Sequence, residues 1–261
     1  MLIFILKYIF MKYILFFIFS TISIIIRGQE NHNAYVVRYH GNFNSLFERS
    51  ENRRNVTATL LMQGDRSLFT MKENGNEVVD PSNISINLSP DSLFTVYKDA
   101  ESNSLLFDFM GLNQHPLYYA DTLHPMEWEI KDEEKSINGV LCKLATTFFK
   151  GRNYNAWFAP TISISNGPWK LGGLPGLILE AYDEEMQWLL TFDSMIQCES
   201  INFTRYDRII SNGIKGYNEF TDYLKKMHGR IQHAFSAQAT GDCLTCDTKS
   251  VVKLYSWEKI N

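Results

Sequence analysis

Short runs of apolar, β-branched and aromatic residues, separated by turn residues, make up most of the chain from residue 34 to residue 206. In Met126–Ile130, apolar and acidic residues alternate, which is typical of a strand with one solvent-exposed face. Pairs such as Asn138-Gly139 mark turns between the runs. The pattern predicts further strands at Ala34–Tyr39, Val56–Leu61, Ser67–Met71, Leu93–Tyr97, Leu105–Phe109, Pro116–Ala120, Val140–Phe149, Tyr154–Phe158, Leu177–Tyr182, Gln187–Ile196 and Ile201–Tyr206.

The number and spacing of these strands predict the fold class. Many short antiparallel strands in one long flat sheet would be unstable, so we expect a mainly β fold whose antiparallel sheet curls or forms a half-barrel. Near the C-terminus the periodicity becomes helical and predicts one amphipathic helix over 217–237, with apolar residues at Phe220, Leu224, Met227, Ile231 and Phe235. We expect this helix to cover one face of the sheet, with partner binding as the alternative.

The first 26 residues are almost entirely apolar and are considered separately from the fold. One interpretation is a signal peptide over residues 1–28, with translation starting at Met1 or Met11 and cleavage before Gln29. The other is an uncleaved anchor, because about 20 apolar residues suffice to span a bilayer. Lys7 and Lys12 disfavour the anchor, since charges are costly inside a membrane helix. We therefore expect a signal peptide and a single domain over 29–261.

The overall charge excludes one function class. With a formal net charge of −4, the chain lacks the basic surplus that general nucleic-acid binding needs.

The sequence contains neither G-x-S-x-G nor H-E-x-x-H, and the spacing of His228 and His233 is not that of a helical metal pair. We expect no catalytic residue, metal or cofactor, and we keep an uncharacterised hydrolase as an alternative.

The chain has four cysteines, an even number that fits export. Cys243 and Cys246 form a C-x-x-C, which can be a zinc half-site, a redox pair or a short-loop disulfide. No second pair of ligands follows at a zinc spacing, so our interpretation is a structural disulfide between Cys243 and Cys246. Cys142 and Cys198 either pair with each other or remain buried thiols.

The stretch Asn166–Asp183, NGPWKLGGLPGLILEAYD, has the most specific pattern. Its glycines are expected at backbone positions that a β-carbon disfavours, and Leu174-Pro175-Gly176 suits a type II turn. The run Leu177–Leu179 predicts a buried strand covered on both sides. We expect a structural role for the motif, which consists of Gly172, Gly173, Leu174, Pro175, Gly176, Leu177 and Ile178.

The string GLPGLI at Gly173–Ile178 resembles the signature of the GLPGLI family, exported proteins of Bacteroidetes that are named for this motif. Neighbouring residues are similar as well: Cys142–Thr146, Gly151-Arg152, Ala156–Phe158 and Gly167–Trp169. Ser163-Ile164 departs from the Ile-Pro that is usual in the family. The resemblance implies a periplasmic or secreted location and a lineage, but no reaction.

A looser likeness concerns the architecture. The expected curled sheet resembles lipoprotein carriers of the LolA type, whose sheet encloses an apolar cavity closed by helices; this likeness is one of fold. The chain has 18 Phe, 13 Tyr and 5 Trp, which could line such a cavity or fill a core. We expect an envelope binding or carrier module for an apolar small molecule, lipid or polypeptide. The alternative function is that of a structural accessory in an outer-membrane or secreted complex. In that case the partner would be an envelope protein.

Overall fold

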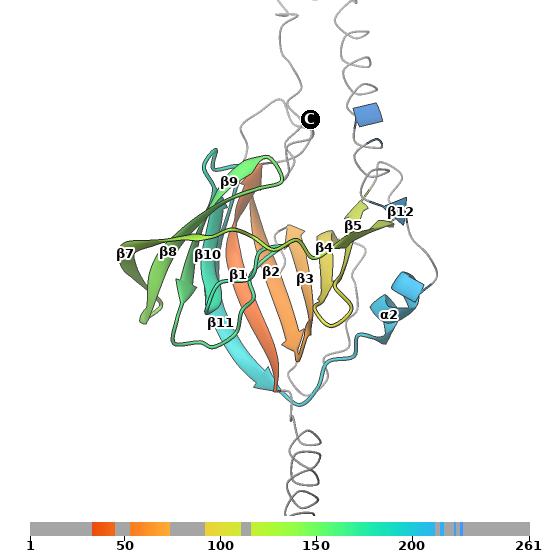
Figure 1. The fold of residues 1–261 in the computed structure, drawn as a ribbon, viewed down its shortest axis with the longest axis horizontal. Helices are drawn as coiled ribbons and strands as arrows, with labels where there is room; N and C mark the ends of the chain where they lie inside the picture. Colours follow the sequence, from red (N-terminus) through yellow and green to blue (C-terminus); the bar gives the residue numbers. More distant parts are fainter. Residues whose placement is uncertain are drawn as a thin grey trace, which may run out of the picture. The chain divides into compact units, whose positions relative to one another are not determined.

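The computed structural model describes residues 33–44, 53–73, 92–110, 116–211 and 215–216, together with Asp222, Lys225 and Lys226. The chain divides into two compact units, and the unit that begins at Ala34 contains every element considered below. Figure 1 shows this unit as one twisted, bent sheet with a short helix. Its elements are β1 (Ala34–Asn44), β2 (Arg53–Gln63), β3 (Arg66–Glu73), β4 (Ser92–Asp99), β5 (Ser104–Met110), β6 (Pro116–Thr122), β7 (Glu129–Ile137), β8 (Val140–Phe149), β9 (Arg152–Ala159), β10 (Leu177–Asp183), β11 (Trp188–Cys198), α2 (Thr204–Ser211) and β12 (Lys215–Gly216).

The prediction of a mainly β, antiparallel fold is confirmed. The strand order is β12-β6-β5-β4-β3-β2-β1-β11-β10-β9-β8-β7, and all neighbours in the described residues are antiparallel except the short β12, which runs parallel to β6. Strands β1 to β6 follow each other in chain order, as do β7 to β11. The pairing of β1 with β11 joins these two meanders.

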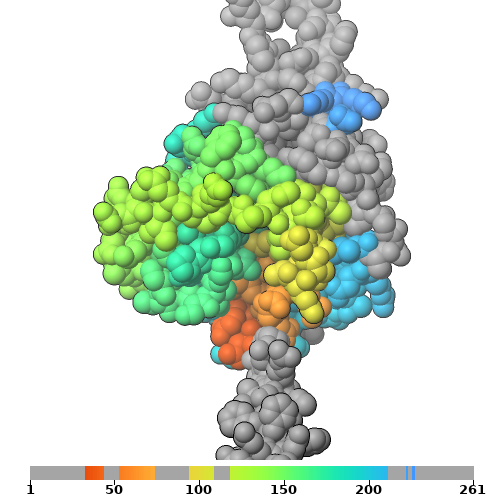
Figure 2. Space-filling model, in the orientation of Figure 1, coloured from red at the N-terminus to blue at the C-terminus, as the bar shows by residue number. Residues whose placement is uncertain are grey.

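A segment that we call the strap, residues 123–128, connects the two ends of the sheet. It leads from β6, near one edge, to β7, the strand at the opposite end of the order. Figure 2 shows the chain around the strap as a yellow-green band across one face of the molecule. Here that face is called the inner face. The predicted strand Met126–Ile130 is therefore wrong in its first half, because Met126–Trp128 has no strand partner and the sheet begins at Glu129.

Two hairpin turns show why the sequence folds into tight meanders. Asn138 and Gly139 have φ angles of 48° and 82°, and Lys150 and Gly151 have 46° and 81°. Positive φ at both central residues is the geometry of a type I′ turn, whose twist matches that of the flanking strands. The turns that join β7 to β8 and β8 to β9 are consequently only two residues long.

Alternating side chains give the sheet two apolar cores. On β1, Val37 and Tyr39 belong to the inner-face cluster, whereas Ala34 and Val36 belong to the cluster on the other face, here called the outer face. The inner-face cluster also contains Val56, Leu60, Phe69, Met71, Val96, Phe107, Tyr154, Trp169, Leu174, Trp188 and Leu190. Apolar residues on both faces are expected where both faces are covered.

Helix α2 covers part of the outer face. Its Tyr206 stacks on Tyr97 of β4, with ring centroids 5.2 Å apart, and Phe203 packs beside it. The predicted strand Ile201–Tyr206 is therefore wrong: Asn202 Oδ1 accepts the N–H of Thr204, and the carbonyl of Phe203 accepts the first helical hydrogen bonds. The helix predicted over 217–237 lies outside the described residues, apart from helical Asp222, Lys225 and Lys226. Among the described residues, no helix has the length and apolar character that a membrane crossing requires.

Leu177, Ile178 and Leu179 are fully buried, as the apolar run predicted. All three belong to the inner-face cluster. The pairing of β9 with β10 shifts between Ile178 and Glu180, which marks a β-bulge. A bulge redirects side chains, so this irregularity, rather than two covering layers, accounts for the burial of three consecutive side chains.

Removal of the Tyr39 hydroxyl should cost about 1 to 2 kcal/mol of stability. The buried Tyr39 hydroxyl donates a 2.9 Å hydrogen bond to the carbonyl of Ile178, across the strand that separates β1 from β10. Tyr39→Phe removes this bond and leaves a buried carbonyl without its donor. The free energy of urea unfolding measures the loss. Tyr35→Phe, at a half-buried position of the same strand, is the control, and an equal loss in both variants would contradict the assignment.

Candidate functional site

The connection between β9 and β10 forms a packed loop, residues 160–176, which we call the motif loop. Asn166 and Gly172 form an isolated bridge across it, and the carbonyl of Asn166 accepts the N–H of Ile178 at 3.0 Å. Trp128 of the strap donates its indole N–H to the carbonyl of Gly172 at 2.8 Å. The strap and the motif loop are therefore held together against the inner face.

The three motif glycines, Gly172, Gly173 and Gly176, differ in backbone conformation and in the space available for a β-carbon. Gly173 has a φ of 87° and Gly176 a φ of 156°, both in a region that favours glycine. A β-carbon on Gly176 would lie 2.2 Å from the carbonyl oxygen of Ala159, which is too close for any real contact. Gly172 differs from the expectation, because its β-carbon would lie 3.7 Å from the nearest atom, the carbonyl oxygen of Ser165.

Trp169 anchors the motif loop in an aromatic cluster. Its φ of 55° is unusual for a bulky side chain and marks local strain. The indole is almost fully buried, with ring centroids 5.6 Å from Tyr154, 6.0 Å from Phe149 and 6.3 Å from Trp188. Contacts with three aromatic rings hold the strained backbone in place.

Lys98 of β4 binds the motif loop through hydrogen bonds. Its alternation with Phe94 and Val96 places it on the apolar inner face, where it is buried. The Nζ atom donates to Asn166 Oδ1 at 2.6 Å, to the carbonyl of Leu171 at 2.9 Å and to the carbonyl of Gly167 at 3.2 Å. Three acceptors match the three N–H bonds of an ammonium group. All three acceptors are neutral oxygens.

A second lysine of the loop is also buried. Lys170 is 5% exposed, and its Nζ lies 3.9 Å from the centre of the Phe107 ring and 5.7 Å from that of Trp169. A cation over an aromatic face is attracted by the ring quadrupole. Both lysines therefore place their side-chain nitrogen on the inner side of the sheet.

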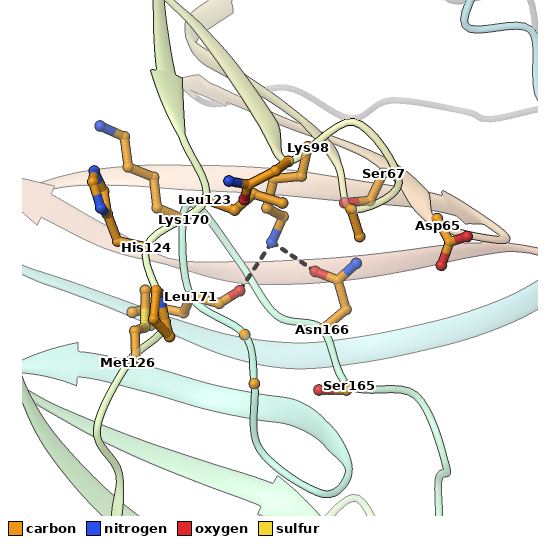
Figure 3. Close-up of a pocket in the computed structure, with 15 residues that line it drawn as sticks. Asp65, Ser67, Lys98, Leu123, His124, Met126, Ser165, Asn166, Lys170 and Leu171 are labelled. Carbon is orange, nitrogen blue, oxygen red and sulfur yellow. Dashed lines mark hydrogen bonds between the residues drawn. The ribbon is translucent and has the colours of Figure 1, made fainter.

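A pocket of about 400 Å³ lies between the strap, the motif loop and the β3 and β4 ends (Figure 3). Gly172 and Gly173 form part of its wall. The Oγ of Ser67 is buried and has no hydrogen-bond partner in the described part of the chain. Ser67 lies directly opposite Lys98 in the β3–β4 register. The lining residues with side chains are Asp65, Ser67, Lys98, Ala100, Asn103, Leu123, His124, Pro125, Met126, Ser165, Asn166, Lys170 and Leu171.

A charged group borders the pocket on the strap side. The His124 ring nitrogen Nε2 lies 3.0 Å from Asp121 Oδ1, and Lys150 Nζ lies 3.0 Å from Asp121 Oδ2. Burial raises the pKa of Asp121, but its hydrogen bonds, that from Lys150 above all, outweigh burial and hold this pKa below its ordinary value. Asp121 is therefore an ionised acceptor that orients His124 at the rim.

The structure brings part of the predicted motif to the pocket. Gly172 and Gly173 line it, whereas Leu174, Leu177 and Ile178 are buried in the inner-face core and Pro175 is exposed. In the described residues, no group of three or more His, Cys, Asp or Glu is arranged to hold a metal ion.

Of the two alternatives for Cys142 and Cys198, the pairing is wrong, because both are free thiols. Cys142 is in β8 and Cys198 in β11, with β9 and β10 between these strands in the sheet. Neighbouring strands are about 4.8 Å apart, so the two thiols are beyond disulfide reach. Cys142 is the buried thiol that the alternative reading expected, and Cys198 is half-buried. Cys243 and Cys246 lie outside the described residues.

Stability should rise with pH because of Lys98. Burial lowers the pKa of Lys98 to about 7, whereas in the unfolded chain it returns to its ordinary value of 10.5. Above pH 7 the unfolded chain therefore binds a proton that the folded chain has lost, and the free energy of unfolding rises by up to about 1.4 kcal/mol per pH unit. Urea unfolding between pH 7.0 and 8.5 measures this slope. The Lys98→Met variant should lose the rise, and a wild-type slope equal to that of the variant would contradict the prediction.

The fold and the site together define a class: an antiparallel-sheet protein with a small mixed pocket beside a glycine-rich loop. A family model described as "Protein of unknown function (Porph_ging)" matches residues 149–180. The match extends from the end of β8 through β9 and the motif loop into β10. This match confirms that part of the chain resembles a family of unknown function.

Two solved structures of PNGF-II are similar to part of the chain. The structure in the C2 space group has a TM-score of 0.45 and 16% identity, and it covers 70% of this chain and 30% of that chain. The structure in the P21 space group has a TM-score of 0.46 and 17% identity, with coverages of 73% and 32%. This chain thus spans about a third of the length of PNGF-II. A comparison with curated proteins gave no match.

Proposed function

We propose that the protein is a binding module for a small molecule, which it holds in the pocket between the strap and the motif loop. The observation that carries this proposal is the buried hydroxyl of Ser67, which has no hydrogen-bond partner among the described residues and lies in a pocket of about 400 Å³. Small-molecule sites are typically concave, roughly 300–1,000 Å³ in volume, and combine apolar walls with a few placed polar groups. Leu123, Met126 and Leu171 provide such walls here.

The filling of the inner face favours a small ligand over a lipid or a polypeptide. Trp169, Leu171 and Leu174 of the motif loop pack into the inner-face cluster, where a carrier for a long apolar chain needs empty space. The pocket beside them is lined by lysine, serine and asparagine side chains as well as apolar ones. A compact molecule with both polar and apolar parts fits this lining best.

The hydrolase alternative needs a nucleophile within hydrogen-bond reach of a base. Ser67 and Lys98 face each other in register, but Ser67 Oγ has no partner in the described residues, and Lys98 Nζ donates to three carbonyl oxygens. His124 is directed to Asp121 at the rim. This arrangement favours binding over nucleophilic catalysis.

The cellular setting belongs to the same proposal. The apolar segment over residues 1–26 supports export to the periplasm or beyond, where the protein acts as a member of the GLPGLI family. In the proposed architecture the bent sheet resembles a half-barrel of the LolA type, and a helix over 217–237 covers a further part of the sheet. The amphipathic spacing from Phe220 to Phe235 supports this helix.

A second candidate is a structural accessory of an envelope complex. Three large apolar side chains are exposed on β7 and β8, at one end of the sheet: Ile130 (49%), Leu141 (54%) and Phe148 (71%). Exposed apolar residues at one edge favour contact with a partner protein. If this candidate is correct, Phe148→Ser should abolish co-purification of an envelope protein without altering the pocket.

The binding proposal is tested by blocking the pocket. Ala100 lines the pocket on the exposed β4–β5 turn, where its backbone N–H donates to the carbonyl of Asp65 and its carbonyl accepts the N–H of Asn103. Ala100→Trp should therefore fill the pocket without disturbing the fold. Ser102→Trp, on the same turn but outside the pocket lining, is the matched control.

Native mass spectrometry and a small-molecule library should be applied to the full-length chain and both variants. A compound that binds wild type and Ser102→Trp but not Ala100→Trp supports the proposal. If no compound distinguishes the two tryptophan variants, and none co-purifies with wild type, the proposal is refuted.

A further inference from the structure

We infer that the ligand of this pocket carries an uncharged carbonyl group, as in an amide, whose oxygen accepts hydrogen bonds from the side chains of Asn166 and Ser67. The inference rests on the proposed binding function and names the chemistry of its ligand. It follows from which polar groups of the lining already bind within the protein and which do not.

The charged side chains of the inner lining are already engaged. Lys98 donates three hydrogen bonds, to Asn166 Oδ1 and to two backbone carbonyls of the motif loop, so each N–H of an ammonium group is used. Lys170 is buried with its Nζ 3.9 Å from the centre of the Phe107 ring. The acidic residue of the lining, Asp65, is exposed. Because burial of a charge without a free counter-charge is costly, the inner lining favours an uncharged ligand group.

The orientation of the Asn166 side chain is fixed by two donors. Its Oδ1 accepts from Lys98 Nζ at 2.6 Å and from the backbone N–H of Gly167 at 2.8 Å. Only the oxygen of a carboxamide accepts hydrogen bonds, so the amide nitrogen must point away from both donors. In Figure 3 this nitrogen points to the side of the pocket on which Ser67 lies. The N–H bonds of Asn166 Nδ2 have no acceptor in the described residues and are available to a ligand.

Ser67 supplies a second uncharged donor. Its hydroxyl is buried and has no hydrogen-bond partner in the part of the chain that the structure describes, although a buried hydroxyl normally has one. Ser67 lies opposite Lys98 in the β3–β4 register, and Lys98 is bonded to Asn166, so both uncharged donors border the same part of the pocket. A carbonyl oxygen has two lone pairs and can accept from both.

The remainder of the lining limits the size of the ligand. Leu123 and Met126 of the strap form an apolar wall, and Gly172 and Gly173 expose backbone on the motif-loop side. Glycine permits close approach of a ligand to the backbone. These features fit one carbonyl group on a short apolar body.

Hexanamide, hexanoate, hexylamine and hexanol are suitable probes, because they are similar in size and differ in their polar group. Their affinities for the full-length protein should be measured by calorimetry at pH 7.5 and constant ionic strength. We expect hexanamide to bind at least tenfold more tightly than each of the other three. Equal or tighter binding of hexanoate or hexylamine would refute the uncharged group, and equal or tighter binding of hexanol would refute the carbonyl.

Variants locate the bound carbonyl. Asn166→Asp keeps an oxygen for Lys98 and removes the N–H donor, so it should weaken hexanamide binding at least tenfold without lowering the urea unfolding midpoint. Ser67→Ala should do the same, because its hydroxyl has no partner in the described residues to lose. Asn55→Asp and Ser136→Ala, at exposed positions of β2 and β7, are the matched controls and should bind normally. Normal hexanamide binding by both pocket variants would contradict the inference.

The outcomes separate this inference from the proposed function. If a charged probe binds as tightly as hexanamide and Ala100→Trp abolishes both, the uncharged carbonyl is refuted while the binding function stands. If no probe binds the wild-type chain, or if Ala100→Trp leaves hexanamide binding unchanged, the inference is also refuted. The binding function itself fails only when the library screen finds no compound that distinguishes Ala100→Trp from Ser102→Trp and none co-purifies.

Discussion

Gly176→Ala should lower the free energy of unfolding by about 4 kcal/mol. The new β-carbon would lie 2.2 Å from the carbonyl oxygen and 2.7 Å from the carbonyl carbon of Ala159, which belongs to the backbone of β9 and has little freedom to move. Strain at the φ of 156° adds about 1–3 kcal/mol, and the forced overlap adds about 1–3 kcal/mol. Urea unfolding monitored by tryptophan fluorescence measures the loss.

Gly172→Ala is the matched control within the same motif. Its β-carbon would meet nothing nearer than 3.7 Å, so the loss should stay below about 1 kcal/mol. Equal losses in the two variants would contradict the backbone explanation. A Gly176→Ala protein of normal stability that no longer binds ligand would show that the motif acts in recognition and not in architecture.

Arg152→Met should cost about 3–5 kcal/mol. Arg152 Nη1 lies 3.0 Å from Asp183 Oδ2 and 2.8 Å from Glu185 Oε2, and the side chains of Arg152 and Asp183 are 6% and 1% exposed. Asp183 Oδ1 also accepts the N–H of Gln187 at 2.7 Å, which fixes the turn into β11. Removal of the arginine leaves a buried carboxylate without its counter-charge, and chemical unfolding at pH 7.5 measures the cost.

The pH dependence of this variant identifies the cause. Burial raises the pKa of Asp183 even beside Arg152, and without the arginine this pKa rises further. A carboxyl whose folded pKa exceeds its unfolded value gains stability as pH falls, so the deficit of Arg152→Met should shrink from pH 7.5 to pH 5. Lys131→Met, at the edge strand β7, is the control, and a deficit that is constant with pH would refute the buried-charge explanation.

Hairpin strands could be predicted because their signals are local. The strand Val140–Phe149 was predicted with the bounds of β8, since Asn138-Gly139 and Lys150-Gly151 fix both ends. The order in which the two meanders join could not be predicted. The pairing of Ala34 with Cys198 depends on apolar faces that many other strands of the chain also offer.

The strap shows why alternation alone misleads. Met126 and Trp128 pack into the inner-face core, whereas Glu127 and Glu129 are exposed, so the alternation is real. Its cause is different from the one predicted: an extended segment lies on a core without a strand partner. Any extended chain that lies on an apolar surface produces this pattern.

Lys98 and Ser67 were not predicted as pocket residues, because each is a single polar residue within an otherwise apolar strand pattern. Lys98 continues the inner-face series of Phe94 and Val96, but the strand was predicted to end at Tyr97. Ser67 similarly begins the series of Phe69 and Met71. A lysine or serine at an inward position is a signal that sequence reasoning could use, whereas the contact of Lys98 with the motif loop depends on tertiary structure.

The joining of β1 to β11 has a consequence for how the protein folds. In the described residues, every other antiparallel pair links strands that are consecutive in the chain, so each meander can form from local hairpins. Only the β1–β11 seam brings together residues as distant as Ala34 and Cys198, and such closure is slow because its entropy must be lost first. Gly41 lies in this seam, where a β-carbon would stand 1.8 Å from the carbonyl oxygen of Leu189. The rate of folding is therefore expected to depend on the seam, whereas substitutions within either meander mainly change how fast the native protein unfolds.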